Sequence, residues 1–123
     1  MPLPDAVFLG HMLGAMNRLS QLLARTDQTT FEQDWVIQDA VIRELEILGE
    51  AAGRVSRAFV AAHPEIPWRE ITGIRHKLVH DYFVVDLGIV WRTATVNVPE
   101  VHPLVRAAAS TLGVGESPDE PAR

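Results

Sequence analysis

The chain has no cysteine among its 123 residues. That absence excludes disulfide scaffolds, zinc ribbons, iron–sulfur sites and thiol nucleophiles. The sequence also lacks any apolar stretch approaching the roughly 18 residues that span a bilayer. Its first residues, Met1 to Asp5, hold no basic region ahead of an apolar run, as a signal peptide would. We therefore expect a cytoplasmic protein with no membrane partner.

Positive charge is scarce. Lysine and arginine together number 11 against 16 acidic residues, which gives a formal net charge of −5. Such a balance argues against broad electrostatic attraction to nucleic acid or to anionic membranes. Any chemistry on phosphate must therefore come from a local cluster of side chains.

Strand-type alternation is missing, and helical periodicity dominates instead. We predict one all-α domain over residues 1–112, an up-and-down bundle of four to five helices, followed by a disordered tail over 113–123. In this prediction Asp5 caps the first helix, and Asp86 caps the fourth. The expected helices run from Asp5 to about Arg25, from Phe31–Gln33 to before His63, over Trp68–His80, from Leu87 to before Pro99, and over Val101–Leu112. The segment Tyr82–Val85 is expected to form a turn.

Both long helices carry bulky apolar residues away from their main stripes, namely Leu9, Leu13, Leu22, Val36 and Ile47. A helix that is apolar over more than about a third of its circumference usually packs against a second partner. In so small a bundle that partner can be another copy of the chain, which predicts a homodimer. A wide core stripe within a monomer is the alternative.

The densest polar cluster runs from Arg75 to Tyr82 and contains the only lysine, the only tyrosine and two of the five histidines. Histidine titrates near neutrality and can accept or donate a proton. Arginine offers a planar fork of donors that matches phosphate oxygens. These residue types suit RNA cleavage without a metal, which needs a base for the 2′-hydroxyl, an acid for the leaving oxygen and a cation on the phosphorane.

The spacing of this cluster constrains how it could work. Arg75 and His80 are five residues apart, about 140° around an ideal helix, so they do not share a face. They converge if the helix ends between them, if the arginine stem wraps around, or if two chains pool their copies. Gly73, just upstream, would permit close approach of a partner helix or a phosphate.

The segment Arg75-x4-His80-x-Tyr82 resembles the Arg-x4-6-His motif of HEPN-fold ribonucleases, in the form found in HepT-like toxins. The resemblance extends to three further segments: Ile47–Ala52, Ile66–Ile71 and Asp81–Trp91. It implies a dimerising helical bundle with the motif in a cleft at the dimer interface. It also implies a metal-independent endoribonuclease of a toxin–antitoxin module, without a cofactor, paired with a nucleotidyltransferase antitoxin that adds AMP to the motif tyrosine.

Carried onto this chain, the resemblance makes Arg75 the phosphate-binding catalytic arginine, His80 the catalytic histidine and Tyr82 the site of AMPylation. His76, Lys77 and Arg54 are candidate substrate-binding residues. Either Arg54 or Arg57 would border the cleft and add positive potential near Arg75. The alternative for Arg54 is an exposed ion-pair face that it shares with Glu46, Glu50 and Arg57.

Two further alternatives stay open. His76 and His80 have the spacing of two metal ligands on one helical face, although Lys77 between them would repel a divalent ion. The protein could also be a catalytically silent helical module whose role is to bind a nucleotidyltransferase. His11 and His63 are expected to be surface or core residues, and the three tryptophans are expected to anchor the core or an interface.

Overall fold

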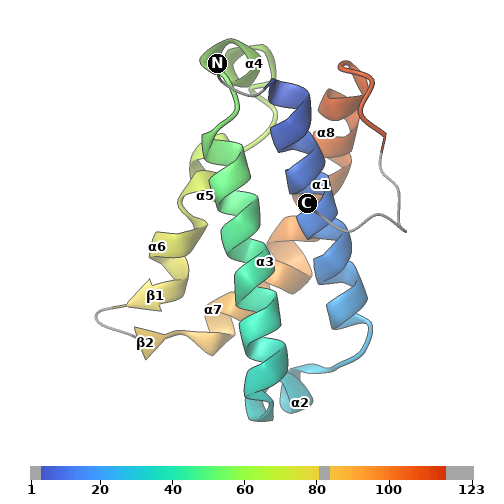
Figure 1. Cartoon of the computed structure of the whole chain (residues 1–123). Coiled ribbons are helices and arrows are strands. Elements are labelled where there is room, and N and C mark those ends of the chain that lie inside the picture. Colours follow the sequence, from blue (N-terminus) through green and yellow to red (C-terminus); the bar gives the residue numbers. More distant parts are fainter. Residues whose placement is uncertain (1–3, 81–83, 116–123) are drawn as a thin grey trace.

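The computed structural model describes residues 4–80 and 84–115, with the backbone alone described for Val79 and His80. Within these ranges the protein is a helical bundle, which confirms the predicted all-α class (Figure 1). The elements in chain order are α1 (Asp5–Leu23), α2 (Gln28–Gln33), α3 (Trp35–Gly53), α4 (Arg57–Ala62), α5 (Trp68–Thr72), α6 (Ile74–Leu78), β1 (Val79–His80), β2 (Val84–Val85), α7 (Leu87–Arg92), the π-helix η1 (Thr93–Asn97) and α8 (Val98–Ser110).

The two long helices α1 and α3 pack against each other along their length, α8 covers α1, and α5 and α6 lie against α3 (Figure 1). Their shared core is formed by large apolar side chains that are almost fully buried, among them Leu9, Met12, Met16, Leu19, Phe31, Leu45, Leu48 and Leu78. None of the described helices is both long and apolar enough to cross a bilayer.

The five apolar residues that led to the prediction of a homodimer differ in how deeply they are buried. Leu9 and Leu13 are buried within the single chain, so they belong to a wide core stripe. Leu22 and Ile47 are half-buried at its edge. Only Val36 is largely exposed, at 58%. The apolar stripes of α1 and α3 are therefore mostly satisfied inside one chain.

The predicted second helix is wrong in its boundaries, because the structure divides it into α2, α3 and α4. Asp34 separates the first two and caps α3 by accepting from the backbone N–H of Val36 at 3.0 Å. The break after α3 is fixed by Asp5, whose carboxylate accepts from the N–H and the hydroxyl of Ser56 at 2.8 and 2.7 Å. The prediction that Asp5 caps α1 is therefore wrong, because its carboxylate instead binds the α3–α4 turn to the start of α1.

Pro99 does not separate two helices, contrary to the prediction. The α7, η1 and α8 segments are continuous from Leu87 to Ser110, although Pro103 also lies inside α8. The π-helix before Pro99 widens the hydrogen-bond ladder by one residue, so that Val98 donates to the carbonyl of Thr93. The predicted Asp86 cap is confirmed by its bond with Ile89 N–H at 3.0 Å.

The motif region also differs from its prediction. The single helix expected over Trp68–His80 is interrupted at Gly73 and ends at Leu78. Val84–Val85 is not part of a turn but a short antiparallel strand, with Val79 opposite Val85 and His80 opposite Val84. The β-branched valines on both sides account for this pairing, since such residues favour extended backbone.

Candidate functional site

The helix α6 carries the polar cluster on a short exposed turn. Ile74 and Leu78 are buried, at 5% and 0% exposure, and hold the helix against the core. Arg75, His76 and Lys77 between them are exposed. The helical spacing predicts that Leu78 and Val79 face the core and that the polar residues of the cluster face out. This is confirmed for Leu78, Arg75, His76 and Lys77, whereas the side chain of Val79 is not among those described.

Gly49 sets the distance between α3 and the segment before the motif. A Cβ atom at this position would lie 3.1 Å from the backbone carbonyl oxygen of Ile71 on α5. That contact is tighter than almost any real Cβ makes with backbone, so only glycine fits without a shift. The close approach expected at Gly73 is merely local, since its nearest neighbour is the Arg69 carbonyl one turn earlier.

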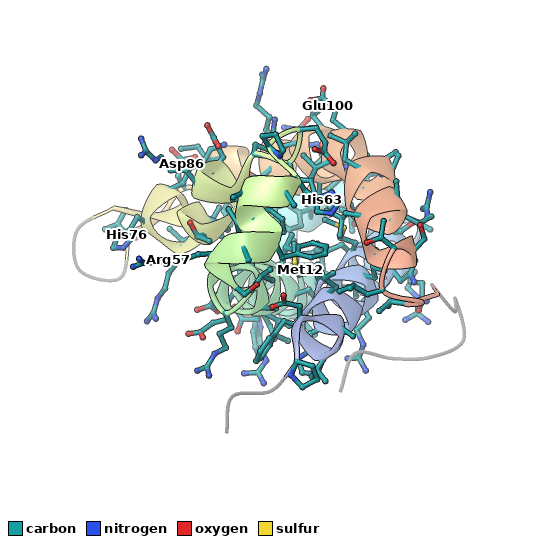
Figure 2. All side chains as sticks on the ribbon, turned by 90° about the horizontal axis from the view of Figure 1, so that it is seen from above. Met12, Arg57, His63, His76, Asp86 and Glu100 are labelled. Atoms are coloured by element: carbon teal, nitrogen blue, oxygen red, sulfur yellow. The ribbon has the colours of Figure 1, made fainter. Side chains whose placement is uncertain are left out.

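A cavity of about 460 Å³ lies between the C-terminal half of α3 and the α5–α6 segment. Arg54, Arg75 and His76 line it together, so the structure brings Arg54 to the motif as expected. Arg57 is on α4 and is not among its lining residues. The remaining lining residues are Glu46, Gly49, Glu50, Gly53 and Thr72. Figure 2 shows His76 pointing outward at the edge of the molecule.

The charged side chains in this cavity form only weak ion pairs with one another. Arg54 pairs with Glu50 at 3.7 Å, but both side chains are about two-thirds exposed, at 66% and 67%. An exposed pair of this kind contributes a few tenths of a kcal/mol, about 0.3–0.5. Within the described part of the chain Arg75 forms no ion pair. No carboxylate of the described residues therefore competes with a phosphate for its guanidinium.

A second cavity, of about 470 Å³, adjoins the first along α3. It shares Glu46, Glu50 and Arg54 with the first and extends toward α1, which contributes His11, while Arg43 lines it from α3. Sequence reasoning placed His11 as a surface or core residue and did not single out Arg43. The signal that could have found Arg43 is its position one turn before Ile47, on the same face of α3.

The other candidate residues are less close to this site or are not described. Lys77 lines a different cavity together with Glu70 and Glu100, so the structure does not bring it to Arg75. The helix ends at Leu78, which meets one of the conditions for Arg75 and His80 to converge. His80 follows in β1 with only its backbone described, and Tyr82 lies outside the described residues.

The other described histidines and tryptophans differ in how they pack. His63 stacks on Phe59 with ring centroids 4.4 Å apart and lies 3.1 Å from a Glu65 carboxylate oxygen. Trp68 is buried and donates to the His63 carbonyl at 3.0 Å. Trp35, in contrast, is 69% exposed at the start of α3. Over the described ranges, no group of three or more potential ligands could hold a metal ion; the His76–His80 pairing depends on a side chain outside them.

Comparison with known proteins points to one family. Residues 12–108 match the model of a family described as HepT-like, ribonuclease HepT-like. A candidate RNase of Caldanaerobacter subterraneus subsp. tengcongensis is 35% identical over 80% of this chain and 88% of its own length. A candidate ribonuclease HepT of Thermococcus cleftensis is 48% identical over 52% of this chain and 58% of its own. A candidate RNase of Methanocaldococcus jannaschii is 37% identical over 76% and 81%, respectively. No solved structure matches the chain significantly.

Proposed function

Because the chain belongs to the HepT-like ribonuclease family, we propose that it is a metal-independent endoribonuclease and the toxin of a toxin–antitoxin module. The observation that carries this proposal is the cavity that Arg54, Arg75 and His76 share. Arg75 and His76 belong to α6, and His80 follows two residues after this helix ends. Arg75 supplies a guanidinium fork for phosphate, and His80 supplies an imidazole five residues later.

In the proposed reaction the 2′-hydroxyl of the RNA is the nucleophile. A base takes its proton, O2′ bonds to phosphorus, and the bond from phosphorus to the leaving 5′-oxygen breaks as an acid protonates that oxygen. His80 serves in proton transfer, and Arg75 binds the charge that accumulates on the phosphorane. The products are a 2′,3′-cyclic phosphate and a 5′-hydroxyl.

A homodimer would supply two copies of these groups, and one face of α3 suits it. Five residues follow one another on this face at helical spacing and line the second cavity: Arg43, Glu46, Ile47, Glu50 and Arg54. Glu46, Glu50 and Arg54 line the first cavity as well. In an antiparallel pair of α3 helices with the two-fold axis near Ile47, Arg43 of each copy meets Glu50 of the other. Such self-complementarity is what an isologous interface requires.

The charge pairing gives the dimer proposal a sharp test. Arg43→Glu alone places two acidic residues opposite each other, and light scattering should then give about the monomer mass of 13.6 kDa. The exchanged variant with Arg43→Glu and Glu50→Arg restores the pairs and should recover the dimer. A monomeric wild type, or a dimer indifferent to both variants, would reject this interface.

The proposed partner that silences the enzyme is a nucleotidyltransferase antitoxin that transfers AMP to Tyr82. In sequence, this sole tyrosine lies between His80 and Val84, which pair across β1 and β2. A phosphate attached there would compete with substrate for Arg75, and the adenosine would exclude RNA. After co-expression, intact mass should rise in AMP units in the wild type and not in Tyr82→Phe. Unmodified protein held silent in a tight complex would instead indicate steric inhibition.

The experiment for the activity itself is cleavage of RNA by the purified protein in excess EDTA, with analysis of the product ends. The proposal expects activity to persist and cyclic phosphate ends to accumulate. Activity that EDTA abolishes would favour a metal site at His76 and His80. Absence of cleavage, with retained binding to the nucleotidyltransferase, would identify the chain as a silent interaction module. Glu46 and Glu50 in the cavity are the feature that favours this second candidate, because they repel phosphate.

A further inference from the structure

Behind the motif helix is a third cavity, of about 260 Å³, that the proposed ribonuclease site does not use. It lies between the α5–α6 segment and the η1–α8 helix. Ile74 and Lys77 of α6 line it, whereas Arg75 and His76 of the same helix line the charged cavity. Figure 2 shows the separation, because His76 and Glu100, one from each cavity, lie on different sides of the molecule.

Most of the wall of this cavity is apolar. The apolar side chains come from five helices, α1, α3, α5, α6 and α8, and they include Met16, Leu48, Ile71, Ile74, Val98 and Val101. A water molecule occupies about 30 Å³ of liquid and needs two to four polar partners when buried. The cavity has room for several waters, but its apolar side chains offer them no hydrogen bonds, so this part of the lining suits an apolar body.

Two polar atoms in the same wall lack hydrogen-bond partners among the described residues. They are the hydroxyl oxygen of Thr93 and the side-chain oxygen of Asn97, both buried and both on residues that line the cavity. Thr93 is only 3% exposed. A buried polar group without a partner is costly and calls for an explanation, and an unplaced ligand is one.

The backbone that presents these two residues is itself unusual. Thr93 and Asn97 are the first and last residues of the π-helix η1. Single π-turns inside α-helices occur frequently at functional sites. In this protein the π-turn places two polar residues four positions apart in the lining of the same cavity. Both unpaired oxygens are covered by protein atoms, so a rotation of these side chains toward the cavity lets them serve one ligand.

The charges at the cavity indicate the sign of the ligand. Glu70, Glu100 and Lys77 are the charged residues that line it, and all three are exposed. Their sum is one negative charge, so an anion is disfavoured at the entrance. The oxygen of Asn97 can only accept a hydrogen bond, and it therefore requires an N–H or O–H donor from the ligand.

We propose that this cavity is a binding site for a small neutral or cationic molecule with an apolar body and an N–H donor, an amide or amine. The donor bonds to the Asn97 oxygen, the Thr93 hydroxyl completes the polar end, and the apolar body fills the space beside Ile71 and Val101. The volume is just below the range of about 300–1,000 Å³ for drug-sized pockets, which limits the ligand to roughly the size of a substituted aromatic ring. This site is separate from the proposed cleavage chemistry.

Benzamide is a suitable probe, followed through the methyl NMR signals of Ile71, Ile74, Val98 and Val101. We expect saturable shifts of these four signals. Methyl benzoate has a similar shape without the N–H and should bind about tenfold more weakly, since one buried acceptor is left unpaired. Benzoate, the anion, should bind more weakly still. These measurements use no RNA, so their outcome is independent of whether the protein cleaves RNA.

Two conservative variants in η1 separate ligand binding from structural effects. Thr93→Val replaces the unpaired hydroxyl by a methyl group, and it should weaken benzamide binding while raising the Tm of the free protein by about 3–6 °C. Thr95→Val is the matched control, because that hydroxyl already donates to the Trp91 carbonyl at 2.7 Å and lies outside the cavity. It should leave benzamide binding intact.

The proposal is overturned if benzamide gives no saturable shifts at these methyl groups, or if methyl benzoate binds as tightly. A lowered Tm in Thr93→Val together with unchanged benzamide binding would also overturn it. That result would mean that ordered water, and not a ligand, satisfies Thr93 and Asn97 in this cavity.

Discussion

The helices α3 and α6 are neighbours with opposite construction. The first has 19 residues and buries Val41, Leu45 and Leu48 in the centre of the bundle. The second has five residues, and only Ile74 and Leu78 hold it in place. Cooperative stability is therefore concentrated in α3, and the groups suited to chemistry are on α6. Substitutions in the two helices should affect different measurements, and this contrast can be tested.

The largest expected effect is on activity in the motif. His80→Ala should lower kcat for RNA cleavage by about 10²–10⁴-fold, since a positioned proton-transfer group contributes that much. His76→Ala is the matched control, and we expect only a several-fold loss because it adds at most a phosphate contact. Equal losses in the two variants, together with sensitivity to EDTA, would favour the metal site.

The next effect is on stability in α3. Leu45→Ala removes a side chain with 0% exposure and should lower the free energy of unfolding by about 2–5 kcal/mol. Urea denaturation measures it. Val36→Ala, on the same helix with 58% exposure, should change stability by no more than about 0.5 kcal/mol. Similar losses in both variants would contradict the assigned core.

Gly49→Ala tests the contact between α3 and the segment before α6, and it should have an intermediate effect on the free energy of unfolding. The new methyl group would lie 3.1 Å from the Ile71 carbonyl oxygen, so α5 must shift. We expect a loss of about 1–3 kcal/mol, partly offset by the better helix propensity of alanine. Gly10→Ala is the control, because nothing lies within 4 Å of a Cβ there. It should be neutral or stabilising. An equal gain in both variants would reject the close α3–α5 approach.

The smallest effect concerns a buried carboxylate on α3. Burial raises the pKa of Glu44 from its ordinary value of 4.5, and Arg18, 3.6 Å away, opposes that rise. The folded state then holds the proton more tightly than the unfolded state does, so the free energy of unfolding falls as pH rises from the unfolded pKa through the folded one.

Glu44→Gln should remove this dependence. Relative to the variant, the wild type should lose stability between about pH 4 and the raised pKa, with a constant difference above it. Urea denaturation across that range checks this, with the exposed Glu32→Gln as control. A wild type that gains stability relative to the variant as pH rises would show that Arg18 outweighs burial.

The same contrast explains what could be predicted from the sequence. Helical spacing correctly predicted that Leu78 is buried and that Arg75, His76 and Lys77 are exposed, because these positions depend on local periodicity. The break after α3 depends on Asp5 bonding to Ser56, 51 residues away, which no local rule reports. In the same way, helix continuity through Pro99 depends on a π-turn that the proline rule does not anticipate.

The candidate site also has features that the sequence predicted and features that it did not. The residue spacing suggested that Arg54 or Arg57 would lie near Arg75, with an exposed ion-pair face as the alternative. The structure places Arg54 in the cavity with Arg75 and also pairs it with Glu50 at the surface. The placement of Lys77 in another cavity was not predicted. It follows from helix geometry, because Arg75 and Lys77 are two residues apart and so lie about 200° apart around α6. The apolar cavity behind α6 was also missed, since its lining comes from helices that are distant in sequence.

The most direct test of the account is a paired measurement on Arg75→Ala: RNA cleavage in EDTA and thermal unfolding of the same preparation. Arg92→Ala, an exposed arginine on α7, serves as the control. We predict that Arg75→Ala lowers kcat/KM by about 10²-fold or more, as expected when a transition-state charge loses its partner, with an unchanged Tm. Cleavage at the wild-type rate would contradict the assignment, as would a loss of activity that merely follows a loss of folding.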